Sequence, residues 1–170
     1  TIDDLHALPK DLYDSKILKV KNKTNGQLII KEYPTASAHS GHFRALFNEL
    51  ALKKSFRPDV VFVDYLNICA SARFKGGNIS SYFYIKAIAE ELRGLAVEFN
   101  VPIFSATQTT RTGFVSTDIG LEDTSESFGL PATADFMFAL MSNEELEQLG
   151  QMKVKQLKNR YNDPAINRSF

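Results

Sequence analysis

One stretch of the sequence decides the fold: Pro58-Asp59-Val60-Val61-Phe62-Val63-Asp64. A continuous apolar run between two acids is typical of a short strand that is covered on both faces, as strands in parallel sheets are. Pro58 cannot continue a preceding helix, so it separates this strand from the segment before it. The sequence therefore predicts a buried strand that ends at Asp64.

A long amphipathic helix and a second strand follow. Ser80 or Ser81 can cap the helix, and Asn100 closes it. Its inner face repeats at steps of three and four residues, through Ile85, Ile88, Leu92, Leu95 and Phe99. The next strand is predicted over Val101–Gln108, and a loop over Cys69–Ile79 precedes the helix. Strand, helix and strand in this order imply a right-handed crossover and a mostly parallel sheet, so the fold class is α/β.

The remaining segments continue the alternation of helices and strands. In chain order we expect a helix over Ile2–Tyr13, a strand over Gln27–Tyr33, a helix capped by Ser40 with the face Phe43, Leu46, Phe47 and Leu50, a strand over Ala134–Met141, a helix over Asn143–Leu149 and a strand over Met152–Leu157. A polar loop is expected over Thr109–Thr124. We expect the whole chain, 1–170, to form a single α/β domain.

The composition limits the classes of protein to consider. Hydrophobic residues make up 44% of the 170 residues and charged residues 24%, which is typical of a globular domain. Cys69 is the one cysteine, so an intrachain disulfide is excluded and a reducing cytoplasm is the expected compartment. No apolar run approaches the roughly 18 residues of a membrane span. The formal net charge is zero, which argues against binding nucleic acid through bulk charge but permits a local basic loop.

Two polar residues stand where a parallel sheet places its ligands. Asp64 and Gln108 come at the carboxyl ends of the two predicted strands that flank the long helix, and ligands of open parallel sheets bind there. An acid directly after an apolar strand can hold a magnesium ion near phosphates, and a glutamine beside it can hydrogen-bond a terminal phosphate. Taken singly, each residue is more often just the first polar residue of a turn.

A wider set of segments resembles DnaB-type replicative helicases, in particular those of T-even-like bacteriophages. Pro58–Leu66 resembles their Walker B segment, and Ser105–Gln108 resembles their sensor motif. Further similar segments are Leu28–Lys31, Lys86–Arg93, Ser125–Ser127, Gly129–Asp135 and Lys158-Asn159-Arg160-Tyr161. The resemblance covers nearly the full chain. It implies a RecA-like motor domain of a 5′–3′ helicase that couples ATP hydrolysis to movement on single-stranded DNA.

The resemblance also implies roles for individual residues. Asp64 would hold Mg²⁺ through water and Gln108 would contact the γ-phosphate of ATP. Lys158 and Arg160 would act on the ATP of a neighbouring subunit in a homo-hexamer. These two residues follow a predicted strand with one residue between them, so their side chains are expected to face the same side.

The same resemblance implies DNA contacts in two loops. Arg73 and Lys75 in the first loop, and Arg111, Glu126 and Ser127 in and after the second, would face single-stranded DNA. For Arg73, Lys75 and Arg111 a solvated turn remains an equally good interpretation. In the family, primase and a helicase loader are partners of the full-length protein, and no membrane is involved.

One family motif is missing from the 170 residues, because no G-x-x-x-x-G-K-[ST] occurs in them. That loop cradles the phosphates of ATP, so we expect this chain alone not to hydrolyse ATP. Two alternatives to a helicase motor stay open: a RecA-like interaction domain without catalysis, and a RecA-type recombinase. The segment Lys158-Asn159-Arg160 matches the helicases better than the recombinases.

Overall fold

A computed structural model describes residues 2–74, 79–109, 120–123 and 129–163 of the chain. The chain divides into two compact units, Thr1–Glu32 and Tyr33–Phe170. The first unit contains helices α1 (Ile2–His6) and α2 (Lys10–Lys23). The single helix predicted over Ile2–Tyr13 is wrong in its bounds, because Pro9 stands at the start of α2 and disfavours the helical conformation of the residue before it.

The predicted strand over Gln27–Tyr33 is also wrong. Residues 24–34 are irregular, and Leu28 and Ile30 are 83% and 84% exposed. A strand needs a neighbour that takes its backbone hydrogen bonds, and none of the described strands pairs with this segment. A short apolar run alone therefore did not determine the structure of this segment.

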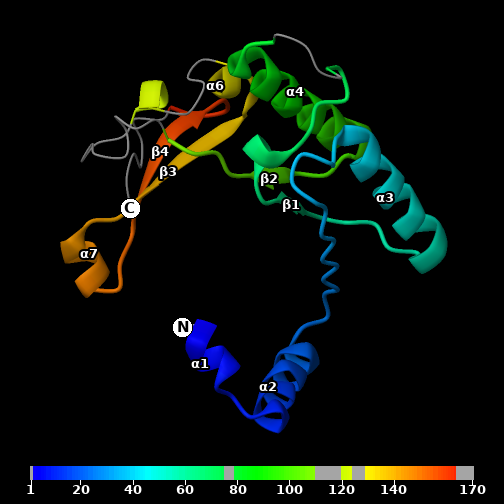
Figure 1. Ribbon diagram of the computed structural model, residues 1–170, viewed down its shortest axis with the longest axis vertical. Helices are drawn as coiled ribbons and strands as arrows, with labels where there is room; N and C mark the ends of the chain where they lie inside the picture. The colour runs from blue at the N-terminus through cyan, green and yellow to red at the C-terminus, as the bar shows by residue number, and fades with distance from the viewer. Residues whose placement is uncertain (1, 75–78, 110–119, 124–128, 164–170) are drawn as a thin grey trace. The chain divides into compact units, whose positions relative to one another are not determined.

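The second unit contains the predicted strand, long helix and second strand, together with the elements around them (Figure 1). Its helices, strands and 3-10 turns are α3 (Ser40–Lys54), β1 (Val61–Val63), η1 (Leu66–Ile68), α4 (Ser81–Phe99), β2 (Ile103–Ser105), η2 (Leu121–Asp123), α6 (Gly129–Thr133), β3 (Phe136–Met141), α7 (Glu144–Gln148) and β4 (Lys153–Asn159). No described helix has the length and apolar character to cross a membrane.

Helix α4 organises the core. Its predicted inner face is confirmed: Ile85, Ile88, Leu92 and Leu95 are buried, and Leu95 is completely inaccessible to solvent. Val63 of β1 and Ile103 of β2 pack against this cluster. Asn100 ends the helix in a left-handed conformation with φ 50°, which asparagine tolerates better than most residues. The helix therefore fixes the strands that carry the candidate site.

Helix α3 begins differently from the prediction. His39, and not Ser40, is the N-cap: its Nδ1 accepts a hydrogen bond from the backbone of Gly41 at 3.0 Å. The backbone N–H of His39 donates in return to Nδ1 of His42 at 3.2 Å. The two imidazoles thus accept hydrogen bonds from two backbone N–H groups at the start of α3, and the hydroxyl of Ser40 is free to bond a residue outside the helix.

Strands β1 and β2 form the predicted parallel pair, with Val61 opposite Ile103 and Val63 opposite Ser105. The expectation that the central strand is covered on both faces is wrong for the described part of the chain. Phe62 and Phe104 stack at 5.3 Å on the face away from α4 and are 72% and 54% exposed. Within that part of the chain, the α4 side of this pair is the packed one.

Strands β3 and β4 depart from the predicted parallel arrangement, because they pair antiparallel. Their connection contains only the five-residue helix α7, whereas parallel neighbours need a crossover of a dozen or more residues. The last strand also ends later than predicted, at Asn159. Lys158 therefore lies within β4, opposite Met137, and not beyond its tip.

Candidate functional site

The parallel pairing brings the ends of β1 and β2 to one edge of the sheet. Ser105 Oγ donates to the carbonyl of Val63 at 2.8 Å, and the backbone N–H of Leu66 donates to the carbonyl of Ala106 at 3.1 Å. Thr107 Oγ1 lies 2.9 Å from Oδ1 of Asn67. These bonds join the segments that follow the two strands, so residues in both are held at a fixed separation.

Asp64 and Gln108 lie at this edge, as predicted. Gln108 Nε2 donates to the hydroxyl of Tyr65 at 3.3 Å, and Tyr65 follows Asp64 directly through a cis peptide bond. Both Asp64 and Gln108 are exposed. The edge thus presents an exposed carboxylate and, from the segment that follows β2, an amide that hydrogen-bonds the residue next to that carboxylate.

The donor set at this edge fits a magnesium ion that is bound together with a phosphate. Mg²⁺ keeps several waters and uses one or two protein carboxylates beside the phosphates of its substrate. Asp64 supplies one such carboxylate. Among the described residues no group of three or more His, Cys, Asp or Glu side chains is arranged to bind a metal by itself.

A second polar cluster surrounds Asp135, the residue before β3. Nη1 of Arg93, on α4, lies 2.8 Å from Asp135 Oδ2, and Nε of Arg160 lies 2.9 Å from Asp135 Oδ1. Lys158 Nζ donates to the carbonyl of Pro131, and Arg160 Nη2 donates to the carbonyl of Ala132 at 3.0 Å. Lys158 and Arg160 thus face the same side, as predicted from their spacing.

This cluster carries more positive than negative charge. Among the described residues, the cations Arg93, Lys158 and Arg160 are the ones that interact with the carboxylate of Asp135 in the contacts given above. Partial burial lowers the pKa of Lys158, and repulsion by Arg160 and Arg93 lowers it further, against the opposing attraction of Asp135. A group of cations that disfavours its own charge in this way is suited to binding an anion.

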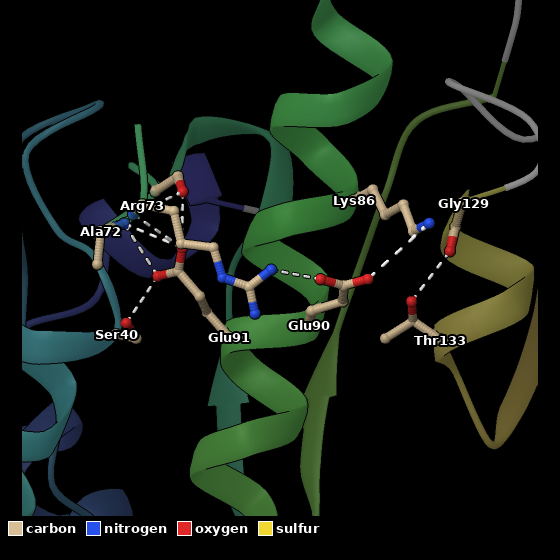
Figure 2. A network of polar contacts seen from close by, with 9 residues as sticks. Ser40, Ala72, Arg73, Lys86, Glu90, Glu91, Gly129 and Thr133 are labelled. Atoms are coloured by element: carbon tan, nitrogen blue, oxygen red, sulfur yellow. Dashed lines mark hydrogen bonds and ion pairs between the residues drawn. The ribbon is translucent and has the colours of Figure 1, made fainter. Parts of the chain in front are cut away.

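The start of the loop between η1 and α4 is tied to α4 by one carboxylate. Glu91 accepts hydrogen bonds from Ser40 Oγ and Ser71 Oγ, each at 2.6 Å, and from the backbone N–H groups of Ala72 and Arg73 (Figure 2). Burial opposes ionisation of Glu91, but these hydrogen bonds outweigh it and lower the pKa of Glu91 below its ordinary value. The first residues of this loop are therefore held against α4.

Arg73 itself points along α4. Its guanidinium pairs with Glu90, whose other oxygen lies 3.9 Å from Lys86 Nζ (Figure 2). A small open cleft of about 160 Å³ lies here, lined by Arg73, Phe74, Phe83, Lys86, Ala87 and Glu90. Proteins that bind single-stranded nucleic acid combine positive charges, which contact the nucleic-acid backbone, with aromatic rings, on which the bases stack. The sequence analysis singled out Arg73 of this cleft as a candidate but not Phe74, Phe83 or Lys86, although aromatic residues beside basic ones were a usable signal.

The other residues of the predicted DNA-binding set, Lys75, Arg111, Glu126 and Ser127, lie outside the described residues. Sequence reasoning also missed Glu91, Arg93 and Asp135 as site residues. Their contacts join residues 18 to 51 positions apart in the chain, and no local motif marks such pairs.

Comparison with known proteins identifies a relative of this chain. The chain is 47% identical over 163 residues to a DnaB-like replicative helicase of Enterobacteria phage T4, which covers 95% of this chain and 34% of that protein. The chain thus spans about a third of the length of this relative. No family model matches the chain.

Solved structures share the fold. One solved ATPase domain superimposes with a TM-score of 0.61 at 20% identity, covering 74% of this chain and 45% of that one. A DnaB-like replicative helicase, solved in a study of its interactions with primase, gives 0.61 at 21% identity over 74% of this chain and 31% of that one. The fold is therefore that of a RecA-like ATPase domain, and the chain belongs to the DnaB-like family of replicative helicases.

Proposed function

We propose that this chain forms part of an ATP-driven motor that moves along single-stranded DNA in a replicative helicase. The observation that carries the proposal is the pairing of Asp64 and Gln108 at one edge of a parallel sheet, joined through Tyr65. The relationship to a helicase of phage T4 supports it, as does the likeness to ATPase domains. Because the chain spans a third of that relative, activity requires residues beyond those described.

At the sheet edge, Asp64 is proposed to hold the magnesium of a bound ATP through water. That ion would neutralise charge on the phosphates. Gln108 is proposed to hydrogen-bond the terminal phosphate and to release it after hydrolysis. Its position directly before the predicted DNA-facing loop gives this release a route to that loop.

Lys158 and Arg160 are proposed to act on the ATP of the next subunit in a ring, taken to be a homo-hexamer. Among the described residues, no hydrogen bond or ion pair joins either side chain to Asp64 or Gln108, and both side chains belong to the cluster around Asp135. An excess of positive charge that is separate from the local nucleotide edge is suited to a phosphate supplied by another molecule.

We further propose that the loops carrying Arg73 and Lys75, and Arg111 with Glu126 and Ser127, bind single-stranded DNA. Primase and a loader are the proposed partners of the complete protein in the host cytoplasm. The test is ATP-dependent and Mg²⁺-dependent unwinding of a forked duplex by the complete protein. Strand separation without ATP, or ATP-dependent pairing of homologous strands in its place, would reject the helicase assignment.

Neutralising the loops is expected to weaken DNA binding without changing sequence preference. In the complete protein, replacing Arg73, Lys75 and Arg111 with glutamine removes cations that neutralise phosphates, so affinity for single-stranded DNA should fall about equally for every sequence. The slope of log affinity against log salt should drop by roughly 0.7 for each phosphate of a single strand that is no longer neutralised. Fluorescence anisotropy over a series of salt concentrations measures both quantities.

The control removes the same charge elsewhere. Lys53 and Lys54 at the end of α3 and Arg57 after it are exposed, and their replacement with glutamine changes the net charge equally. This control should leave the salt slope unchanged. If both triple variants bind with the slope of the unmodified protein, the loops are solvated turns that do not contact DNA.

A further inference from the structure

Arg160 is held in place through both its backbone and its side chain. Its backbone N–H donates to the carbonyl of Asp135 at 2.9 Å. In the guanidinium, Nη2 donates to the carbonyl of Ala132 at 3.0 Å and Nε lies 2.9 Å from Asp135 Oδ1. The side chain is 41% exposed. The edge formed by Nε and Nη2 is therefore engaged, while part of the side chain stays accessible to another group.

Asp135 provides the charged part of this arrangement. Its Oδ1 is shielded from solvent and, without an aligned hydrogen bond in the described structure, depends on the nearby charge of Arg160. A shielded carboxylate oxygen is costly unless a cation lies against it, so the pair resists separation. The mutual attraction keeps the Arg160 guanidinium from sampling the many rotamers that a long exposed side chain otherwise adopts.

Asp135 is itself fixed from the other side. Nη1 of Arg93 donates to Asp135 Oδ2 at 2.8 Å and to the carbonyl of Thr133 at 2.9 Å. Arg93 stands on α4, one residue after Leu92 of the buried core. The chain of contacts thus runs from the rigid core helix through Arg93 and Asp135 to Arg160.

We propose that Asp135 is a positioning residue for Arg160, held by Arg93, which sets the guanidinium in place before the nucleotide of a neighbouring subunit arrives. This inference rests on the proposed function, because it takes Arg160 to act on ATP. Asp135 does not touch the nucleotide. Asp135 fixes the Arg160 guanidinium in advance. The Arg160 side chain therefore loses no conformational freedom, and does not move, as negative charge develops on the phosphates during hydrolysis.

The test replaces Asp135 with asparagine in the complete helicase and measures DNA-stimulated ATP hydrolysis. The carboxamide is nearly isosteric but neutral, so the guanidinium loses its ionic partner. We expect kcat to fall by roughly tenfold to a hundredfold, the range that misplacing a catalytic group can cost. KM for ATP should change by less than about twofold, because the substitution leaves the loop that binds the phosphates of ATP unchanged. Asp135→Glu keeps the charge and should retain more of kcat than Asp135→Asn does.

A double-mutant comparison separates positioning from general damage. In an Arg160→Ala background, Asp135→Asn should lower kcat no further, because the group it positions is gone. Glu98→Gln is the matched control, because it breaks a similarly exposed ion pair between Glu98 on α4, the helix that carries Arg93, and Arg44 on α3. It should leave kcat unchanged. If Asp135→Asn does not assemble, Asp135→Glu is compared in both backgrounds by the same criterion.

The outcomes distinguish this inference from the proposed function. Wild-type kcat for Asp135→Asn, or an equal loss in the Arg160→Ala background, overturns the positioning role. Wild-type kcat for Arg160→Ala alone overturns the proposed role of Arg160, on which the inference depends. A low kcat for Arg160→Ala with an unchanged Asp135→Asn rejects the inference and leaves the proposed function standing.

Discussion

Replacing Arg160 with alanine in the complete protein should reduce ATP hydrolysis by about a thousandfold or more, the range measured for arginines that act on the nucleotide of another protein. The physical reason is that a planar guanidinium offers paired N–H groups to phosphate oxygens as charge builds up on them. Affinity for ATP in the ground state should change little. Steady-state hydrolysis, measured with saturating single-stranded DNA, gives kcat and KM separately.

Arg160→Lys is the informative companion. Lysine keeps the charge but lacks the fork, and its single ammonium group cannot bind Asp135 and a phosphate in the same geometry. An activity between those of the wild type and Arg160→Ala is therefore expected. Full activity for Arg160→Ala would remove this residue from the mechanism and leave it as a solvated charge beside Asp135.

Replacing Asp64 with asparagine should nearly abolish Mg²⁺-dependent hydrolysis. A magnesium ion at the phosphates contributes several kcal/mol to the transition state, and each 1.36 kcal/mol is a factor of ten, so a loss of about a hundredfold or more is expected. The Mg²⁺ concentration that gives half-maximal activity should rise, because a neutral amide oxygen is a weaker ligand for a hard cation than a carboxylate is. Titration of activity against Mg²⁺ measures both effects.

Asp59 provides the matched control at the other end of the same strand. Asp59 and Asp64 are both exposed carboxylates that bracket β1, so Asp59→Asn makes the same chemical change away from the edge that carries Gln108. Asp59→Asn should keep wild-type activity and Mg²⁺ dependence. Equal losses in the two variants would mean that β1 is merely destabilised and that Asp64 has no special role.

Some parts of the molecule were predictable because local sequence determines them. The inner face of α4 repeats over five turns, and an apolar stripe of that length can be buried in only one way. The placement of Asp64 and Gln108 beyond the same ends of two paired strands followed from the strand–helix–strand order, since a helical crossover joins parallel strands. The common orientation of Lys158 and Arg160 followed from their spacing.

Other parts depend on distant contacts that a local pattern does not contain. Residues 27–33 have strand-like residues but no described strand pairs with them, so they stay irregular. His39 and not Ser40 caps α3, because the hydroxyl of Ser40 bonds Glu91, which is 51 residues away. The role we assign to Asp135 likewise arises only when α4 and β4 meet, because neither Arg93 nor Arg160 is its sequence neighbour.

We propose that ATP is hydrolysed between subunits, and mixing two kinds of inactive subunit is the decisive experiment. One preparation of the complete protein carries Arg160→Ala, and the other carries a disabled phosphate-binding loop. Each ring alone should be inactive, because every interface lacks one of the two components. Mixed rings contain some interfaces that combine an intact loop with an intact Arg160, so ATP hydrolysis should partly return on mixing. Hydrolysis that stays at the level of the two inactive parents, in rings shown to have exchanged subunits, would contradict an arginine that acts across the interface.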